Sequence, residues 1–156
     1  MSEIRVNTIK SEDGTQPISF NKGVNVSGVL TATSYAGNVT GDLTGSVDTG
    51  QSVIAGVTAT KTSTSIASID TFSASTYRSA NYQIQVVRGT NYNMTTINII
   101  HDGTNTYMTE YGNVNQPSVG IATFSTDVNS GDLRLLAYPD AATATTFKFI
   151  YSAIKS

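Results

Sequence analysis

Hydrophobic and polar residues follow two different patterns along this chain of 156 residues. In the first part, aliphatic residues and glycine alternate with mostly polar positions, as in an extended strand. The alternating residues are Val24, Val26, Gly28, Leu30 and Ala32. From about residue 55, glycine becomes rarer, aromatic residues appear, and short alternating runs recur between turn signals. We therefore expect an extended, Gly-rich arm or stalk over residues 1–55 and a folded domain over residues 56–156.

The arm ends in three consecutive tetrads of the form glycine, polar, aliphatic, and Thr or Asp. They are Gly37-Asn38-Val39-Thr40, Gly41-Asp42-Leu43-Thr44 and Gly45-Ser46-Val47-Asp48. A helix is disfavoured, because a glycine in each turn costs about 1 kcal/mol relative to alanine. An extended chain would carry a stripe too thin to bury alone, which favours several identical chains winding together; a flexible linker is the alternative.

The arm therefore supplies the residues that we expect to make contacts between copies or with a larger assembly. These oligomer or attachment residues are Val24, Val26, Leu30, Gly37, Val39, Gly41, Leu43, Gly45 and Val47.

The alternating runs and turn signals of the second part predict eight strands and no amphipathic helix. The expected strands cover residues 57–61, 66–73, 81–88, 94–101, 105–111, 119–127, 132–138 and 145–154. Two of the turns are well marked, because Asp102-Gly103-Thr104-Asn105 and Asn129-Ser130-Gly131-Asp132 supply residues that favour tight reversals. The pattern predicts an all-β fold, an antiparallel β-sandwich of jelly-roll-like type.

Composition narrows the functions that this fold can serve. Only 13% of residues are charged, about half the usual share, and the formal net charge is -2. Without clustered Lys and Arg, we expect neither a nucleic-acid partner nor a membrane surface, and no apolar run is long enough for membrane insertion. The polar start predicts no signal peptide, and the absence of cysteine removes disulfides, thiol nucleophiles and Cys-ligated zinc.

The sequence contains few candidates for catalytic residues. His101 and Asp102 are neighbours, but adjacent strand residues point to opposite faces and Asp102-Gly103 already serves a turn. The acids that could form a glycosidase pair stand mostly at predicted turns, and no loop has the acidic density of a calcium site. We expect no catalytic residue, no cofactor and no metal in one chain, although an ion on a symmetry axis stays open. Arg134, in an apolar strand, is expected to pair with a carboxylate or carbonyl of a neighbouring subunit.

Seven of the eight tyrosines lie in the second part, where they could serve core packing, subunit contacts or sugar binding. The residues proposed for contact with a glycan or partner are Tyr92, Asn93, Asn113 and Asn115.

Both parts of the chain resemble a known group of proteins. The start IRVNTIKSEDGTQPISFNKGVNVSGVLTATSYAGNVTGDLTGSV is similar to the N-terminal and repeat segments of virion structural and tail-fibre proteins of marine tailed phages, especially cyanophages. The segments INIIHDGTNTYMTEYG, GDLRLL and FKFIYSAI resemble a β-sandwich module at the ends of such proteins.

The resemblance implies a homotrimeric protein of the virion surface, made in the host cytoplasm and not an enzyme. Its partners would be its own copies and other virion proteins of the capsid or tail. It would be a capsid decoration (cement) protein or a short spike or fibre attached through its arm. The alternative is a tail-fibre module that recognises host surface glycans.

Overall fold

The computed structural model describes Ile9, Lys22, residues 24–27, Val29, Thr31, residues 45–116 and residues 119–156. Its contacts divide the chain into two units, Met1–Gly41 and Asp42–Ser156. The expected boundary was residue 55. Residues 46–48 of the last tetrad and residues 52–55 after it lie in strands that pair within the second unit.

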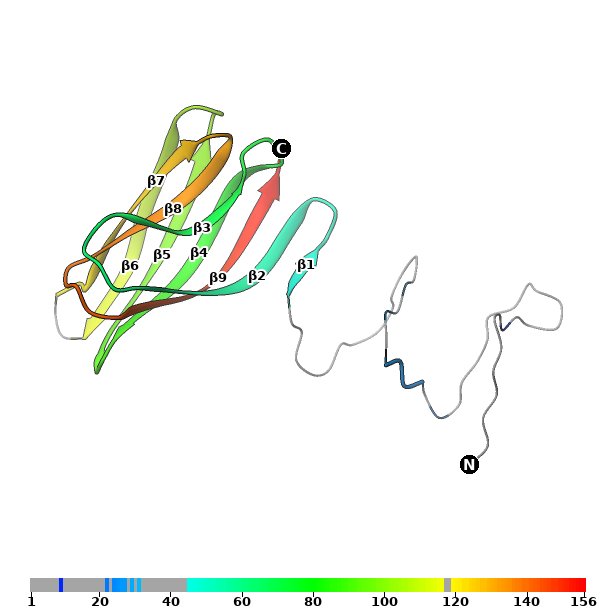
Figure 1. The fold of residues 1–156 in the computed structure, drawn as a ribbon. Helices are drawn as coiled ribbons and strands as arrows, with labels where there is room; N and C mark the ends of the chain where they lie inside the picture. Colours follow the sequence, from blue (N-terminus) through cyan, green and yellow to red (C-terminus); the bar gives the residue numbers. More distant parts are fainter. Residues whose placement is uncertain are drawn as a thin grey trace. The chain divides into compact units, whose positions relative to one another are not determined.

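The second unit is an antiparallel β-sandwich, which confirms the fold class that the alternating pattern predicted (Figure 1). Its strands are β1 (Ser46–Asp48), β2 (Ser52–Lys61), β3 (Ala67–Ser73), β4 (Tyr77–Arg88), β5 (Asn91–His101), β6 (Thr106–Gln116), β7 (Ala122–Asn129), β8 (Asp132–Pro139) and β9 (Thr145–Lys155). Eight of them, β2 to β9, overlap the eight predicted runs.

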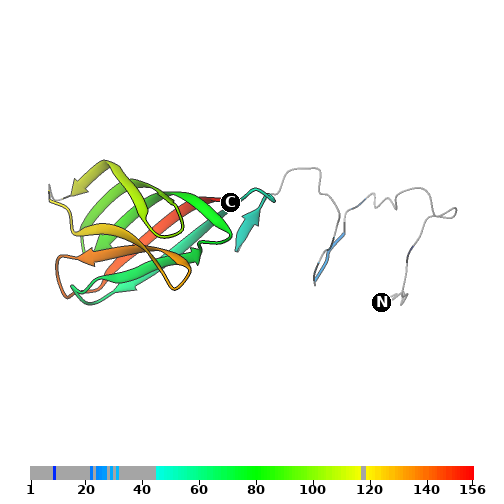
Figure 2. The same ribbon diagram turned by 90° about the horizontal axis from the view of Figure 1, so that it is seen from above.

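The strands form a six-stranded sheet in the order β1-β2-β9-β4-β5-β6 and a three-stranded sheet in the order β3-β8-β7. The two layers are seen from above in Figure 2. Both predicted hairpins are present, β5–β6 around Asp102-Gly103 and β7–β8 around Ser130-Gly131. The jelly-roll subtype stays a prediction, since one sheet has six strands and the other has three.

Alternation in the strands decides which side chains fill the space between the sheets. In β4, every second residue from Ala80 to Val86 is buried, and these residues face Ile97 and Ile99 of β5. Leu133 and Leu135 of β8 close the core from the other sheet. The Tyr82 ring lies at 5.7 Å from Phe149 and 5.4 Å from Tyr151, between ring centroids.

A β-bulge changes the course of β6. The register with β5 shifts between Met94 and Thr96, so that Gly112 and Asn113 oppose Thr95 alone. Gly112 has a φ of 70°, which a side chain would strain. The bulge lets the strand continue to Gln116, five residues beyond the end that its alternation indicated.

Candidate interaction surfaces

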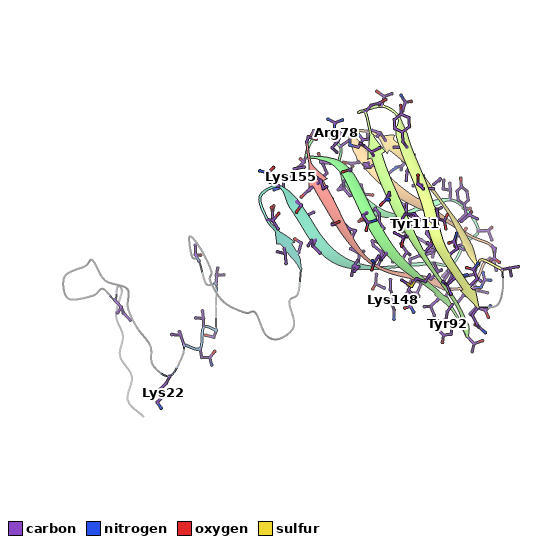
Figure 3. All side chains as sticks on the ribbon, turned by 180° about the vertical axis from the view of Figure 1, so that it is seen from behind. Lys22, Arg78, Tyr92, Tyr111, Lys148 and Lys155 are labelled. Atoms are coloured by element: carbon purple, nitrogen blue, oxygen red, sulfur yellow. The ribbon has the colours of Figure 1, made fainter. Side chains whose placement is uncertain are left out.

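The outer face of the six-stranded sheet carries most of the exposed apolar side chains of the sandwich. In each strand, the positions that alternate with the buried core residues point away from the core. The register pairs these outward positions with one another across the sheet. These side chains are between 41% and 67% exposed: Val47, Ile54, Tyr92, Met94, Ile100, Tyr107, Tyr111, Val114, Ile150 and Ile154. Figure 3 views the molecule from this side, with Tyr92, Tyr111 and Lys148 labelled.

The face has three parts that follow the strand order. The aliphatic flank, on β1, β2 and β9, consists of Val47, Ile54, Ile150 and Ile154. The amide strip, on β4 and β5, consists of Asn81, Gln83, Gln85 and Asn98. The aromatic flank, on β5 and β6, consists of Tyr92, Met94, Ile100, Tyr107, Tyr111 and Val114.

Hydrogen bonds link the amide strip to the aromatic flank. Asn81 Nδ2 donates to Asn98 Oδ1 at 2.5 Å, and Asn98 Nδ2 donates to the Tyr111 hydroxyl at 3.4 Å. These two hydrogen bonds together connect β4, β5 and β6. They therefore hold the strip and one side chain of the flank in a common arrangement.

A hollow of about 400 Å³ opens on the same face beside Gly56. Gly56 lies opposite Ile150 in the register, and a Cβ at this glycine would meet nothing within 4 Å. The hollow is bordered by Gln85, Met94 and Lys148. It is large enough to accept an apolar side chain from another molecule.

Charge is distributed unequally between the two outer faces. Among the outward positions of the six-stranded sheet, Lys148 is the single charged residue. The three-stranded sheet presents Asp127 and Arg134, whose Oδ1 and Nε atoms are 2.7 Å apart. The partner of Arg134 thus lies on the same chain, and the expectation of a partner in a neighbouring subunit was wrong.

The residues proposed for glycan contact separate in space. Tyr92 lies on the outer face, 48% exposed. Asn93, Asn113 and Asn115 border a different hollow, of about 230 Å³, at the edge where β6 passes β7. Glu110 also borders it and accepts a hydrogen bond from Thr95 Oγ1 at 3.0 Å. We call this site the amide hollow.

Asn93 corrects one of these assignments. It is 8% exposed, its Oδ1 accepts the backbone N–H of Ile121 at 3.0 Å, and its Nδ2 bonds to Asn115 Oδ1. Those bonds satisfy buried groups and connect β5 to the segment before β7. Asn93 is therefore a structural residue, and Asn113, which is exposed, is the more accessible amide of the hollow.

The turn between β5 and β6 uses both residues of the His101-Asp102 pair. His101 is buried; its Nε2 bonds to Tyr77 O at 2.7 Å and its Nδ1 accepts Gly103 N–H at 3.0 Å. The Asp102 carboxylate accepts backbone N–H groups of Asn105 and Thr104 at 2.7 and 2.9 Å, and these bonds hold its pKa well below the usual range. Both side chains serve the turn, as the sequence predicted for Asp102.

A carboxylate also lies inside the sandwich. Asp70 Oδ2 accepts the hydroxyl of the fully buried Tyr82 at 3.0 Å. Burial raises the pKa of Asp70, against the opposing effect of this hydrogen bond, and raises the pKa of Tyr82 as well. Asp70 follows a bulge in β3, where the register shifts between Ser68 and Asp70. No feature of its sequence context indicated that it points inward.

The arm residues are only partly described. Val24 and Val26 are 59% and 45% exposed, and Val47 lies in β1, which begins after Gly45. The other residues predicted to make contacts lie outside the described residues: Leu30, Gly37, Val39, Gly41 and Leu43. The role of the arm in oligomerisation or attachment stays a prediction.

The sequence contained a signal for the outer face that alternation alone did not reveal. Ile99-Ile100 in β5 and Phe149-Ile150 in β9 place apolar residues at consecutive positions, so that both faces of these strands carry them. A strand exposed to water on one side usually alternates apolar with polar residues. Consecutive apolar positions in an antiparallel sheet therefore indicate a second surface to be covered.

Comparisons with known proteins give no family for this chain. No protein-family profile matches it, and no curated protein matches it. Among solved structures, it is similar to the tailspike protein of Acinetobacter phage vB_ApiP_P1, with 16% identity and a TM-score of 0.34 over 79% of this chain. The match spans 24% of the tailspike chain. A likeness at this TM-score carries no argument about function.

The part of the chain that the structure describes contains no helix long and apolar enough to cross a membrane. Within the same residues, no group of three or more His, Cys, Asp or Glu side chains could hold a metal ion.

Proposed function

We propose that the chain is a structural protein of a phage particle, a homotrimer that displays its β-sandwich and attaches through its N-terminal arm. The observation that carries the proposal is the outer face of the six-stranded sheet, which is apolar, exposed and almost free of charge. The largest apolar patch of a monomeric protein is usually about 300–600 Å². A face of ten half-exposed apolar side chains is typical of a surface that other protein covers.

The sequence supplies the kind of assembly. Its repeat tetrads and the segments INIIHDGTNTYMTEYG and FKFIYSAI resemble virion structural and tail-fibre proteins of marine phages. In this proposal the protein lies on the particle surface, as a capsid decoration protein or a short spike or fibre. It performs no catalysis and needs no cofactor, and its partners are its own copies and other virion proteins.

The test has two measurements on the full chain. Light scattering after size-exclusion chromatography should give three times the 16.4 kDa chain mass. Immunogold labelling of purified particles should then locate the protein on the capsid or the tail. A stable monomer at micromolar concentration, together with unlabelled particles, would contradict the proposal.

The amide hollow favours a second candidate, recognition of host surface glycans. Asn113, Asn115 and Glu110 offer donors and acceptors around one opening, as neutral sugars require. Binding of the full chain to a glycan array, lost in Asn113→Ala but retained in Tyr92→Ala, would support this role. No signal on an array of host polysaccharides would remove it.

A further inference from the structure

The second half of β2 is an open edge of the six-stranded sheet. β1 is short, and its three residues pair with residues 53–55 at the start of β2 (Figure 1). On its other side, β2 pairs with β9 along its whole length, from Ser52 to Lys61. Among the residues that the structure describes, no strand pairs with residues 56–61 on the side of β1. We call this stretch the β2 edge.

Two hydrogen bonds show which backbone groups point to each side of β2. The Lys155 N–H donates to Gln51 O at 2.9 Å, at the end of the β2–β9 pair. Because successive residues of a strand direct their N–H and C=O groups to opposite sides, odd-numbered residues of β2 bond to β9. Even-numbered residues direct theirs toward β1, and the Thr49 N–H accordingly donates to Ser52 O at 2.8 Å.

Three even-numbered residues therefore present unpaired backbone groups at the β2 edge: Gly56, Thr58 and Thr60. All three are exposed. Proteins usually protect an open edge with charged residues, proline or a bulge. Residues 56–60 contain no charged residue and no proline, and no register shift interrupts them. The β2 edge is thus suited to strand addition, in which an extended segment bonds to free main-chain groups.

The third tetrad shows what kind of segment this strand accepts. Ser46–Asp48 of that tetrad form β1 and pair antiparallel with β2. β1 begins after Gly45, whose φ of 111° lies outside the range of a regular strand. The second tetrad, Gly41–Thr44, has the same pattern of glycine, polar, aliphatic and Thr or Asp. Each chain therefore carries a further segment of the type that already pairs with β2.

The second tetrad fits the β2 edge in the register that β1 sets. Val47 lies opposite Ile54, so four positions further along Leu43 would lie opposite Thr58. Four is a multiple of the two-residue period of a strand, and the aliphatic side chains therefore stay on one face. Leu43 would then extend the row of Val47 on the outer face of the sheet.

Charge supports the same register on the other face. Asp42 would lie opposite Ala59, diagonally from Lys61, and diagonal neighbours are within reach of long side chains. Within the described part of the chain, no ion pair uses Lys61. The Asp42 carboxylate would supply a partner for this ammonium group.

The conformation of Gly45 indicates which chain supplies the tetrad. A tetrad of the same chain would need Gly45 to continue β1 as a regular strand, and its φ of 111° does not allow this. A short hinge in such a position favours exchange of the next segment between copies. The incoming tetrad therefore belongs to another copy.

From these observations we infer that the β2 edge receives Gly41–Thr44 of a neighbouring copy as an added antiparallel strand, with Leu43 opposite Thr58. This inference rests on the proposed function, because it names a contact through which one copy of the proposed homotrimer holds the next. It concerns main-chain pairing at an edge and is separate from any cover of the outer face.

Cross-linking between two differently tagged chains tests the inference, because the sequence has no cysteine. One full-length chain carries Leu43→Cys, the other carries Thr58→Cys, and the two are co-expressed and treated with a bismaleimide that has a two-carbon linker. Each chain has a single thiol, so a link within one chain is impossible. Directly opposite residues have Cβ atoms about 4.5–5.5 Å apart, which this probe can span.

The expected result is a covalent dimer on a denaturing gel that contains one tag of each kind. The matched control replaces Thr58→Cys with Ile54→Cys, because Ile54 is 50% exposed on the same strand but its edge is occupied by β1. Four residues, about 13 Å, separate the two positions, and the control should give no mixed dimer. Absence of the mixed dimer with Thr58→Cys, or an equal yield with Ile54→Cys, would overturn the inference.

Light scattering and particle labelling separate this inference from the proposed function. If the parent chain has a trimer mass and labels particles while no mixed dimer forms, the copies associate through another surface. The inference then fails and the proposed function stands. If the parent chain is monomeric and particles are unlabelled, both fail.

Discussion

Replacing Ile150 with threonine should weaken assembly without unfolding the sandwich. Ile150 is 57% exposed and lies opposite Gly56, on the aliphatic flank. Threonine keeps the β-branched shape that suits a strand, so that β9 should form as before. What is lost is part of the apolar surface that the next copy would cover.

The magnitude follows from the exposed area. Full burial of an isoleucine side chain contributes about 1.5–3 kcal/mol, so the exposed half that threonine shortens is worth about 1 kcal/mol per contact. A ring of three copies contains three such contacts, and their sum is about 3 kcal/mol per trimer. Since 1.4 kcal/mol corresponds to a factor of ten, the trimer dissociation constant should rise about 100-fold. The concentration at half assembly varies with the square root of that constant, so it should rise about tenfold.

Sedimentation equilibrium over a range of concentrations measures this shift. Ile66→Thr is the matched control, because Ile66 is 45% exposed but lies between β2 and β3, outside the face. The control should assemble like the parent, and both variants should unfold at similar urea concentrations. Equal assembly of Ile150→Thr and Ile66→Thr would refute the reasoning, as would a loss of assembly that accompanies unfolding.

Three further substitutions test the sandwich itself. Burial raises the pKa of Asp70, so the stability that its carboxyl contributes is present below the unfolded pKa of about 4 and is lost as pH rises through the folded pKa. In urea unfolding, Asp70→Asn should therefore gain stability relative to the parent between about pH 4 and pH 7. A loss of stability relative to the parent over this range would contradict the reasoning. Asn93→Ala should cost about 1–3 kcal/mol, measured in the same way, because Ile121 N–H loses its buried acceptor. Gly103→Ala should cost about 1–2 kcal/mol in thermal unfolding, since its φ is 106°, whereas Gly56→Ala should cost less; equal losses would argue against strain at the turn.

The local pattern of the sequence predicted the strands well because alternation and turn residues act over a few positions. It placed β7, β8 and β9 within a few residues of their observed bounds. It ended β6 at Tyr111, because the bulge at Gly112 interrupts the alternation on which the prediction depended. Similarly, the glycine-rich composition before residue 55 concealed β1 and the start of β2.

Side-chain partners were harder to predict, since they depend on the particular register between paired strands. Asn93 stands beside the exposed Tyr92 in the sequence, yet points to the opposite side of β5 and bonds to the segment before β7. Arg134 meets Asp127 because the β7–β8 hairpin places the two residues opposite each other. Neither contact follows from composition or periodicity alone.

The third tetrad connects the arm to the interaction face. Gly45-Ser46-Val47-Asp48 supplies β1, in which Val47 lies beside Ile54 on the outer face. Asp48 points to the other side, where its carboxylate bonds to Lys155 Nζ at 2.9 Å. The aliphatic position of this tetrad thus belongs to the same surface as the aliphatic flank.

The first two tetrads repeat the spacing of the third, with Val39 and Leu43 in the position of Val47. The sequence thus repeats one aliphatic spacing three times before β2, and the last of these aliphatic residues, Val47, is 41% exposed on the outer face of the six-stranded sheet.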